Sequence, residues 1–175
     1  MKELYKIIFF FPCFVFAQVP PVAVPDTETV LEDAATTSID VIVNDTDADT
    51  EDTLTLTAVA TAGTGTVAIN SDGASVDYTP AADFNGTEVI TYTVSDGTLT
   101  DETGTLTITV TAVNDATVAS NVSAATVENS NATIHLVASD VDFDNLTYTI
   151  VSSPTNGSLG TVVNSTVTYT PTTNY

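Results

Sequence analysis

Acidic side chains are concentrated in two short runs of this sequence, and their spacing suits the binding of a divalent cation. Residues 44–54 (NDTDADTEDTL) place five carboxylates within eight residues, and residues 139–146 (SDVDFDNL) repeat the pattern, with no Lys or Arg near either run. Two carboxylates about 4 Å apart repel by roughly 1 kcal/mol in water and roughly 4 kcal/mol near a protein surface. A hard cation with oxygen ligands relieves this repulsion. We therefore expect calcium at these loops, with Asp47 and Asp49 as ligands in the first run and an affinity of about 0.1–1 mM.

A second interpretation of the acidic runs stays open. They can be solvated loops of a surface adapted to salt water, where cations screen the charge without occupying specific sites. Neither run fits an EF-hand, because a loop that begins at Asp45 has Thr50 where glycine is required, and a loop that begins at Asp140 ends at Val151.

The charge balance and the N-terminus together predict export. The 175 residues contain 23 acidic side chains against two basic ones, Lys2 and Lys6, and the formal net charge is -21. Residues 1–6 are typical of the charged region of a signal peptide and residues 7–16 of its apolar region, so cleavage is expected after Ala17. The apolar stretch is too short to span a bilayer, which needs about 20 residues.

The mature chain would then begin at Gln18 and contain no Lys, Arg or Cys. It has no side chain suited to contact a phosphate, which excludes nucleic acid and anionic membrane surfaces as partners, and no membrane insertion is expected after cleavage. Without disulfides, the domain must be held by its core and by bound cations. We predict a bacterial protein that is secreted or displayed at the cell surface.

Beyond the proline-rich residues 19–25, apolar side chains recur at every second position, which is the pattern of half-buried β-strands. Turns separate these segments at residues 63–65, 71–73, 85–86 and 95–97, where glycine is expected to supply a positive φ angle. Seven strands in about 95 residues predict an all-β fold, a seven-stranded antiparallel Greek-key sandwich. The first strand is expected near residues 29–31, and the inward positions of the other six are Ile39/Val41/Val43, Leu54/Leu56/Ala58, Val67/Ile69, Val76/Tyr78, Ile90/Tyr92/Val94 and Leu106/Ile108/Val110.

The sequence also repeats itself with a period of about 95 residues. Tyr78-Thr79-Pro80, for example, recurs as Tyr169-Thr170-Pro171. The register divides the mature chain into a first repeat, residues 18–115, and a partial second repeat, residues 116–175, which lacks its last two strands. We expect the partial repeat to carry an unpaired apolar edge, not to be independently stable, and to belong to a longer protein.

The order and spacing of several short motifs carry a resemblance to a known family. These motifs are VLED at 30–33, the Asp-x-Asp run before LTLT, YTP at 78–80, DFNG at 83–86, YTVSDG at 92–97 and VNDA at 113–116. Together they resemble the bacterial cadherin-like and immunoglobulin-like tandem repeats of large secreted and surface proteins.

The resemblance implies a calcium site at the join of two repeats. Its ligands are an acid near the end of the first strand, an Asn-Asp pair in the linker and the Asp-x-Asp of the following repeat. In this sequence those residues are Glu32, Asn114, Asp115, Asp140 and Asp142. Asp83 stands in for an acidic motif before the sixth strand, and Asp96 marks a ligand position at the end of that strand. Further repeats of the same chain are the implied partners.

These observations favour a structural or adhesive repeat at the N-terminus of a large secreted or cell-surface protein, with calcium stiffening the joins between repeats. Two alternatives stay open: a module that binds a surface glycan or a partner adhesin, and a spacer of a secreted enzyme. Catalysis within this chain is not expected, because the mature chain has no Lys, Arg or Cys from which to build an activated nucleophile or an oxyanion clamp. The one histidine, His135, falls on the outward side of a predicted strand.

Overall fold

The computed structural model describes residues 18–61, 63–98 and 101–175. The predicted signal peptide, residues 1–17, lies outside the described residues. The chain forms two compact units that divide between Ala112 and Val113, here called the first unit and the second unit. No helix in the described part of the chain is long and apolar enough to cross a membrane.

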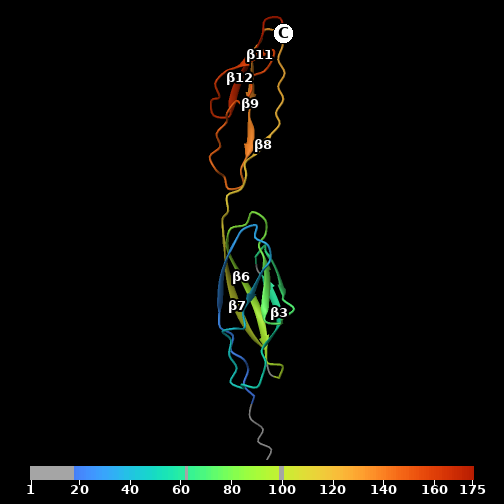
Figure 1. Cartoon of the computed structure of the whole chain (residues 1–175), viewed down its shortest axis with the longest axis vertical. Coiled ribbons are helices and arrows are strands. Elements are labelled where there is room, and N and C mark those ends of the chain that lie inside the picture. Colours follow the sequence, from blue (N-terminus) through green and yellow to red (C-terminus); the bar gives the residue numbers. More distant parts are fainter. Residues whose placement is uncertain (1–17, 62, 99–100) are drawn as a thin grey trace, which may run out of the picture. The chain divides into compact units, whose positions relative to one another are not determined.

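Within its described residues, the first unit contains seven strands in two sheets, and each sequence-predicted strand is found. Strands β3, β6 and β7 of this unit are labelled in Figure 1. One sheet has the order β1-β7-β6-β3 and the other the order β2-β5-β4. The bounds are β1 Asp26–Leu31, β2 Thr37–Asp40, β3 Thr55–Thr61, β4 Thr66–Ile69, β5 Ser75–Thr79, β6 Gly86–Ser95 and β7 Glu102–Thr111. All pairs are antiparallel except β1 with β7, which is parallel and departs from the all-antiparallel prediction. The architecture is all-β and compatible with the predicted Greek-key sandwich.

A single core joins the two sheets, because the inward side chains of both belong to one buried cluster. The strands β6 and β7 dominate it, with five buried hydrophobic side chains: Ile90, Tyr92, Leu106, Ile108 and Val110. Val94 of β6 is also buried. Alternation of buried residues with less buried ones produces this face from Glu88 to Val94 in β6 and from Gly104 to Val110 in β7.

Two predicted inward positions are wrong, and both lie where the backbone leaves regular geometry. Val43 is 78% exposed, because β2 ends at Asp40 and the chain turns before it reaches Val43. In β3 the register shifts between Leu56 and Ala58, so Ala58 is exposed and Val59 packs against the core in its place. A bulge of this kind inverts the faces of the residues that follow it.

The turn glycines serve two different purposes. Gly73, Gly86 and Gly97 have positive φ angles, as predicted. Gly63 and Gly65 do not, which corrects the prediction for residues 63–65. A Cβ on Gly65 would lie 2.7 Å from Cε2 of Tyr78 and 2.9 Å from the carbonyl oxygen of Thr79. Glycine is needed at this position for close packing rather than for backbone conformation.

The second unit repeats one sheet of the first unit. Its strands β9 (Ala132–His135), β12 (Thr166–Pro171) and β11 (Gly157–Leu159) form a sheet of order β11-β12-β9. In this sheet Val167 pairs with Ile134 as Val76 pairs with Ile39 in the first. The short strands β8 (Val118–Ser120) and β10 (Val137–Ser139) form a separate pair.

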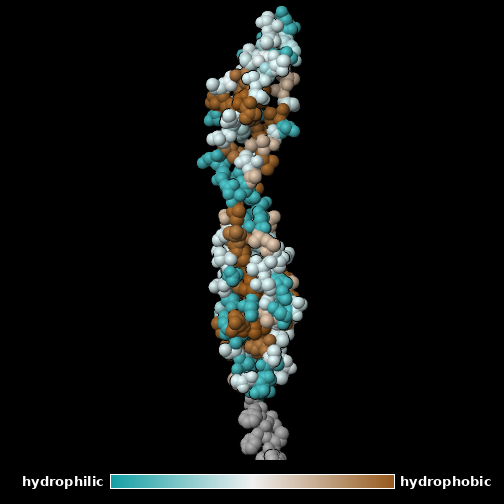
Figure 2. Space-filling view, in the orientation of Figure 1, coloured by the Kyte–Doolittle hydropathy of each residue, from teal (hydrophilic) through white to brown (hydrophobic). Residues whose placement is uncertain are grey.

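The second unit has little core of its own. Every residue from 113 to 175 is described, and among the hydrophobic side chains of this range Val167 is the one that is buried. Hydrophobic surface is correspondingly visible on this unit in Figure 2. His135 is exposed at the end of β9, as predicted.

Candidate functional site

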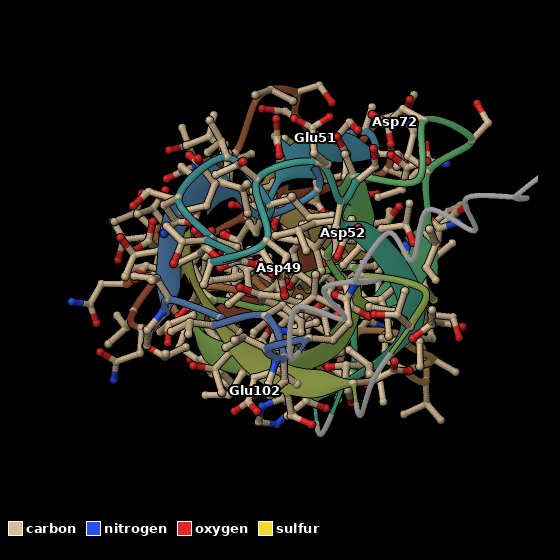
Figure 3. The ribbon with its side chains drawn as sticks, turned by 90° about the horizontal axis from the view of Figure 1, so that it is seen from below. Asp49, Glu51, Asp52, Asp72 and Glu102 are labelled. Carbon is tan, nitrogen blue, oxygen red and sulfur yellow. The ribbon has the colours of Figure 1, made fainter. Side chains whose placement is uncertain are left out.

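The acidic loop of the first unit lies between β2 and β3. Asp47, Asp49 and Asp52 each offer a carboxylate oxygen, and these oxygens all lie within 4.8 Å of one another. Asp49 and Asp52 are labelled in Figure 3, where they lie near each other and away from Asp72 and Glu102. The sequence singled out Asp47 and Asp49, and the structure adds Asp52 to them.

Local turns bring these carboxylates together. The backbone N–H of Asp49 donates to Oδ1 of Asp47 at 2.7 Å, which closes an Asx turn. The N–H of Asp52 donates to the carbonyl oxygen of Asp49 at 2.9 Å, and residues 48–51 run through bends and turns. All three carboxylates are half-buried.

The N-terminal segment of the first unit lies along this loop. The N–H of Val19 donates to Oδ2 of Asp49 at 2.7 Å, and Val22 and Thr46 exchange backbone hydrogen bonds of 2.8 and 3.1 Å. The N–H of Val24 donates to Oδ1 of Asp45, also at 2.7 Å. Backbone dipoles therefore supply part of the compensation for this charge, since no Lys or Arg follows residue 6.

The electrostatics of the loop favour a bound cation. Burial, followed by the neighbouring charges of Asp49, Asp96 and Asp47, raises the pKa of Asp52. Oδ2 of Asp47 is buried and has no hydrogen-bond partner among the described residues. Asp96, predicted as part of this acidic region, is 7% exposed at the end of β6, and its Oδ1 accepts the N–H of Thr98 at 2.7 Å. A divalent cation relieves the repulsion between neighbouring carboxylates.

The second unit builds the same loop from its own residues. The N–H of Asp142 donates to Oδ1 of Asp140 at 3.1 Å, as Asp49 does to Asp47. The N–H of Asp115 donates to Oδ2 of Asp142 at 2.7 Å, as Val19 does to Asp49. The hydroxyl of Thr117 also donates to Asp140, at 3.0 Å.

The remaining predicted ligands have identifiable partners within their own units. Nδ2 of Asn114 donates to the carbonyl oxygen of Asp115 at 2.7 Å in the second unit. In the first unit, Oε2 of Glu32 accepts from Asn85 at 3.3 Å, and the N–H of Asp83 donates to Asp33 at 3.1 Å. The five-residue calcium site at the join stays a prediction.

One buried acid was missed by the sequence reasoning. Glu88 in β6 is 3% exposed, and its carboxylate accepts the N–H of Thr64 at 2.5 Å, the N–H of Gly65 at 3.1 Å and the hydroxyl of Tyr78 at 2.9 Å. The available signal was its position, because Glu88 shares the inward face of β6 with Ile90 and the two alternate positions after it. This acid fastens the turn between β3 and β4 to β6 and, through Tyr78, links β6 to β5 of the other sheet.

The sequence matches the family described as Bacterial Ig domain twice, over residues 18–109 and 114–175. No curated protein matches the chain. Among solved structures, the endo-fucoidan hydrolase MfFcnA4 of glycoside hydrolase family 107 is 20% identical with a TM-score of 0.44, and the match covers 94% of this chain and 25% of that one. The related hydrolase MfFcnA9 is 17% identical with a TM-score of 0.38, covering 87% and 29%. A chimeric titin Z1Z2 is 11% identical with a TM-score of 0.33, covering 91% and 85%.

This chain spans between a quarter and a third of the length of the two hydrolase chains. The two segments that match the family take in most of the sequence, and they confirm the resemblance to bacterial immunoglobulin-like tandem repeats. The chain belongs to the bacterial Ig domain family.

Proposed function

We propose that this chain is a non-catalytic structural repeat segment of a secreted or cell-surface bacterial protein, and that its Asp-x-Asp loops bind calcium. The observation that carries this proposal is that the same loop is built twice. In each unit the first Asp accepts the N–H of the second, and the second Asp accepts an N–H from the segment that precedes the first strand. Calcium at such a loop would fasten that segment to the loop and stiffen one end of the repeat.

The chemistry of the ligands supports calcium over other metals. The candidate ligands are carboxylate oxygens, from Asp47, Asp49 and Asp52 in the first unit and from Asp140 and Asp142 in the second. Oxygen-only sets suit the hard cations calcium and magnesium, whereas zinc and copper favour sites with His or Cys. Irregular loops with several carboxylates also suit the flexible coordination of calcium better than the strict octahedron of magnesium.

The test is a calorimetric calcium titration of the full chain, with melting curves recorded in parallel. At free calcium twenty times the dissociation constant, one site that binds only the folded state adds about 1.8 kcal/mol to the free energy of unfolding. For a domain of this size that corresponds to a rise of roughly 7–14 °C in the melting temperature. Sodium chloride at matched ionic strength provides the control. An equal rise with sodium alone would reject calcium sites in favour of general screening.

Two variants locate the sites. Asp52→Asn keeps the size of the side chain and should remove most of the calcium response of the first unit, and Asp142→Asn should do the same for the second, since its amide oxygen can still accept the N–H of Asp115. Glu102→Gln removes one charge from an exposed position in β7 and should leave the response unchanged. Equal effects of all three substitutions would indicate that the calcium response depends on the net charge of the chain rather than on these loops.

A further inference from the structure

The predicted cleavage after Ala17 would create an ammonium group at the start of the first unit. The mature chain has no Lys or Arg, and apart from His135 its one basic group is the α-amine of Gln18. An α-amine has an ordinary pKa of about 7.7–8.0, so at about pH 6.5 it is positively charged. The position of this one charge therefore matters in a unit with so many carboxylates.

Gln18 lies against the acidic loop whose Asp49 and Asp52 are labelled in Figure 3, and it lines one pocket with both of these acids. With its side-chain nitrogen Nε2 facing the loop, Gln18 donates to Oδ2 of Asp49 and to Oδ2 of Asp52, both at 3.0 Å. The opposite orientation would set the amide oxygen against two carboxylates, so the contacts favour the donating orientation. The side chain of Gln18 is thus a donor to two acids of the loop.

The backbone next to Gln18 is fixed to the same carboxylate. The N–H of Val19 donates to Oδ2 of Asp49 at 2.7 Å. The α-nitrogen of Gln18 lies at most about 4.3 Å from the nitrogen of Val19, because only Cα and the carbonyl carbon separate them. It is therefore within about 7 Å of Oδ2 of Asp49. At this range an ammonium group and a carboxylate attract each other, most strongly at low salt.

The two units differ at this place in a way that fits an N-terminal cation. In the second unit the position of Gln18 is taken by Asn114, an internal residue without a free α-amine. Among the described residues, no cluster of three carboxylates lies within the second unit, whereas Asp52 completes one in the first. The additional acid thus occurs in the unit that would carry the additional cation.

We propose that the α-ammonium group of Gln18 is the resident cation of this acidic loop, and that Gln18 is a modification site at which cyclisation to pyroglutamate removes the cation. In this reaction the neutral α-amine attacks Cδ of the side-chain amide. A bond forms between the α-nitrogen and Cδ, and the bond between Cδ and Nε2 breaks. Nε2 takes a proton from the amine and leaves as ammonia. The product is a neutral lactam, and the reaction needs no oxidant or cofactor.

Cyclisation would remove two kinds of contact at once. The positive charge disappears with the amine, and Nε2, the donor to Asp49 and Asp52, leaves with the ammonia. While the loop stabilises the amine as an ammonium group, that nitrogen is not nucleophilic, so cyclisation should be slower in the folded chain than in urea. Calcium would use the same carboxylates. The measurements are therefore made in calcium-free buffer, where failure of this inference is distinguishable from failure of the calcium proposal.

The test uses protein that a bacterial host has exported and cleaved, with its N-terminus read by mass spectrometry. A glutaminyl cyclase converts Gln18 to pyroglutamate, the loss of one ammonia confirms the conversion, and urea unfolding compares the two forms at low salt. At about pH 6.5 cyclisation should lower the folding equilibrium constant of the first unit roughly three- to tenfold. At about pH 10 the difference should shrink, because the uncyclised amine has lost its charge. Equal stability of the two forms at about pH 6.5, or an N-terminus elsewhere than Gln18, would overturn the proposal.

The variant Gln18→Ala separates the ammonium group from the amide, because it keeps the α-amine and cannot cyclise. Relative to the cyclised protein, its stability should decline between about pH 6.5 and about pH 10, as that of the uncyclised wild type does. The absence of this decline in Gln18→Ala would contradict an ion pair at the loop.

The rate of uncatalysed cyclisation, followed by mass, tests the contact with Asp49. Asp49→Asn should speed the reaction in the folded chain, whereas Glu102→Gln, at an exposed position of β7, should leave its rate unchanged. The proposal fails if the rate is the same in the folded wild type, in Asp49→Asn and in urea. Hydrogen exchange in β6 reports that each variant is folded.

Discussion

Glu88 provides the sharpest test of how the first unit is held together. Its side chain is buried in a chain without Lys or Arg beyond residue 6, so hydrogen bonds rather than an ion pair must compensate its charge. The donors are the N–H groups of Thr64 and Gly65 and the hydroxyls of Thr64 and Tyr78. The substitution Glu88→Gln preserves the shape of the side chain and removes the charge. We expect it to destabilise the first unit without changing its fold.

The size of this destabilisation can be estimated from the hydrogen bonds that the substitution weakens. A bond to a charged acceptor contributes about 1.5–3 kcal/mol to stability and a neutral bond about 0.5–1.5 kcal/mol. The Gln oxygen can retain the bonds to Thr64 and Gly65 in neutral form, and the Gln amide can donate to Tyr78, whose hydroxyl also accepts. Weakening these hydrogen bonds, offset in part by the lower cost of burying a neutral group, gives a loss of about 2 kcal/mol. That loss corresponds to a decrease of roughly 8–16 °C in the melting temperature of the first unit.

The difference in the free energy of unfolding between wild type and the Glu88→Gln variant should also depend on pH, which provides a second test. Burial raises the pKa of Glu88, but the hydrogen bonds from Gly65, Thr64 and Tyr78 outweigh it, so the pKa lies below its usual value. A lowered carboxyl pKa stabilises the fold above the pKa of the unfolded chain, about 4.3, and this stabilisation is lost as the pH falls through the folded value. The difference should therefore be full at pH 7 and should shrink below about pH 4.

Urea unfolding followed by hydrogen exchange in β6 measures the first unit separately from the second. Glu102→Gln, on exposed β7, is the control for loss of one charge, and a double-mutant cycle with Tyr78→Phe isolates the bond between Tyr78 and Glu88. The reasoning fails if Glu88→Gln changes the free energy of unfolding by less than about 0.5 kcal/mol, the usual range for surface substitutions, or if the difference is the same at about pH 3 and at pH 7.

Four further substitutions test the remaining structural arguments. Asp52→Asn should raise the melting temperature in calcium-free buffer, because it removes a carboxylate whose pKa is raised by burial and by its neighbours; the gain should be present at pH 7 and vanish as the pH falls through that pKa. Gly65→Ala should destabilise the first unit by about 1–3 kcal/mol, measured by urea unfolding, because its Cβ overlaps Tyr78 and backbone. Ile108→Ala should cost about 2–5 kcal/mol in the same assay, because Ile108 is fully buried. Tyr169→Phe should change hydrogen exchange in β12 by less than about tenfold, because Tyr169 is only half-buried and donates to a single carbonyl group.

The fold could be predicted from the sequence wherever the backbone keeps a regular period. The alternation in residues 90–94 and 106–110 predicted the buried faces of β6 and β7, and both are fully or almost fully buried. Val43 and Ala58 were assigned to the wrong side, because the end of β2 and the bulge in β3 interrupt the alternation. The parallel pairing of β1 with β7 was also missed, because the spacing of apolar residues along a strand does not indicate the direction of its neighbour.

The candidate site was predictable in composition and only partly in geometry. The acidic runs pointed to Asp47 and Asp49, whose carboxylates do come together, but through an Asx turn that spacing alone does not specify. Asp52 joins them because the chain turns back after Asp49, which depends on backbone conformation. Glu88 was overlooked because acidic residues are usually assigned to the surface. It lies two positions before Ile90 in β6, and therefore on the same inward face of the strand.

Comparison of the two units separates the determinants that act locally from those that need β6 and β7. The sheet β11-β12-β9 keeps the strand pairing of β4-β5-β2, although residues 113–175 contain no counterpart of the central hairpin. This sheet therefore depends mainly on its own turns and strand pairs. Residues 146–150 have the same apolar alternation as the start of β3, yet they form no strand. Alternation predicts which face a side chain takes, but a strand forms only where a neighbour supplies the backbone N–H and C=O groups. The exposed Val151 is the expected consequence of that missing neighbour.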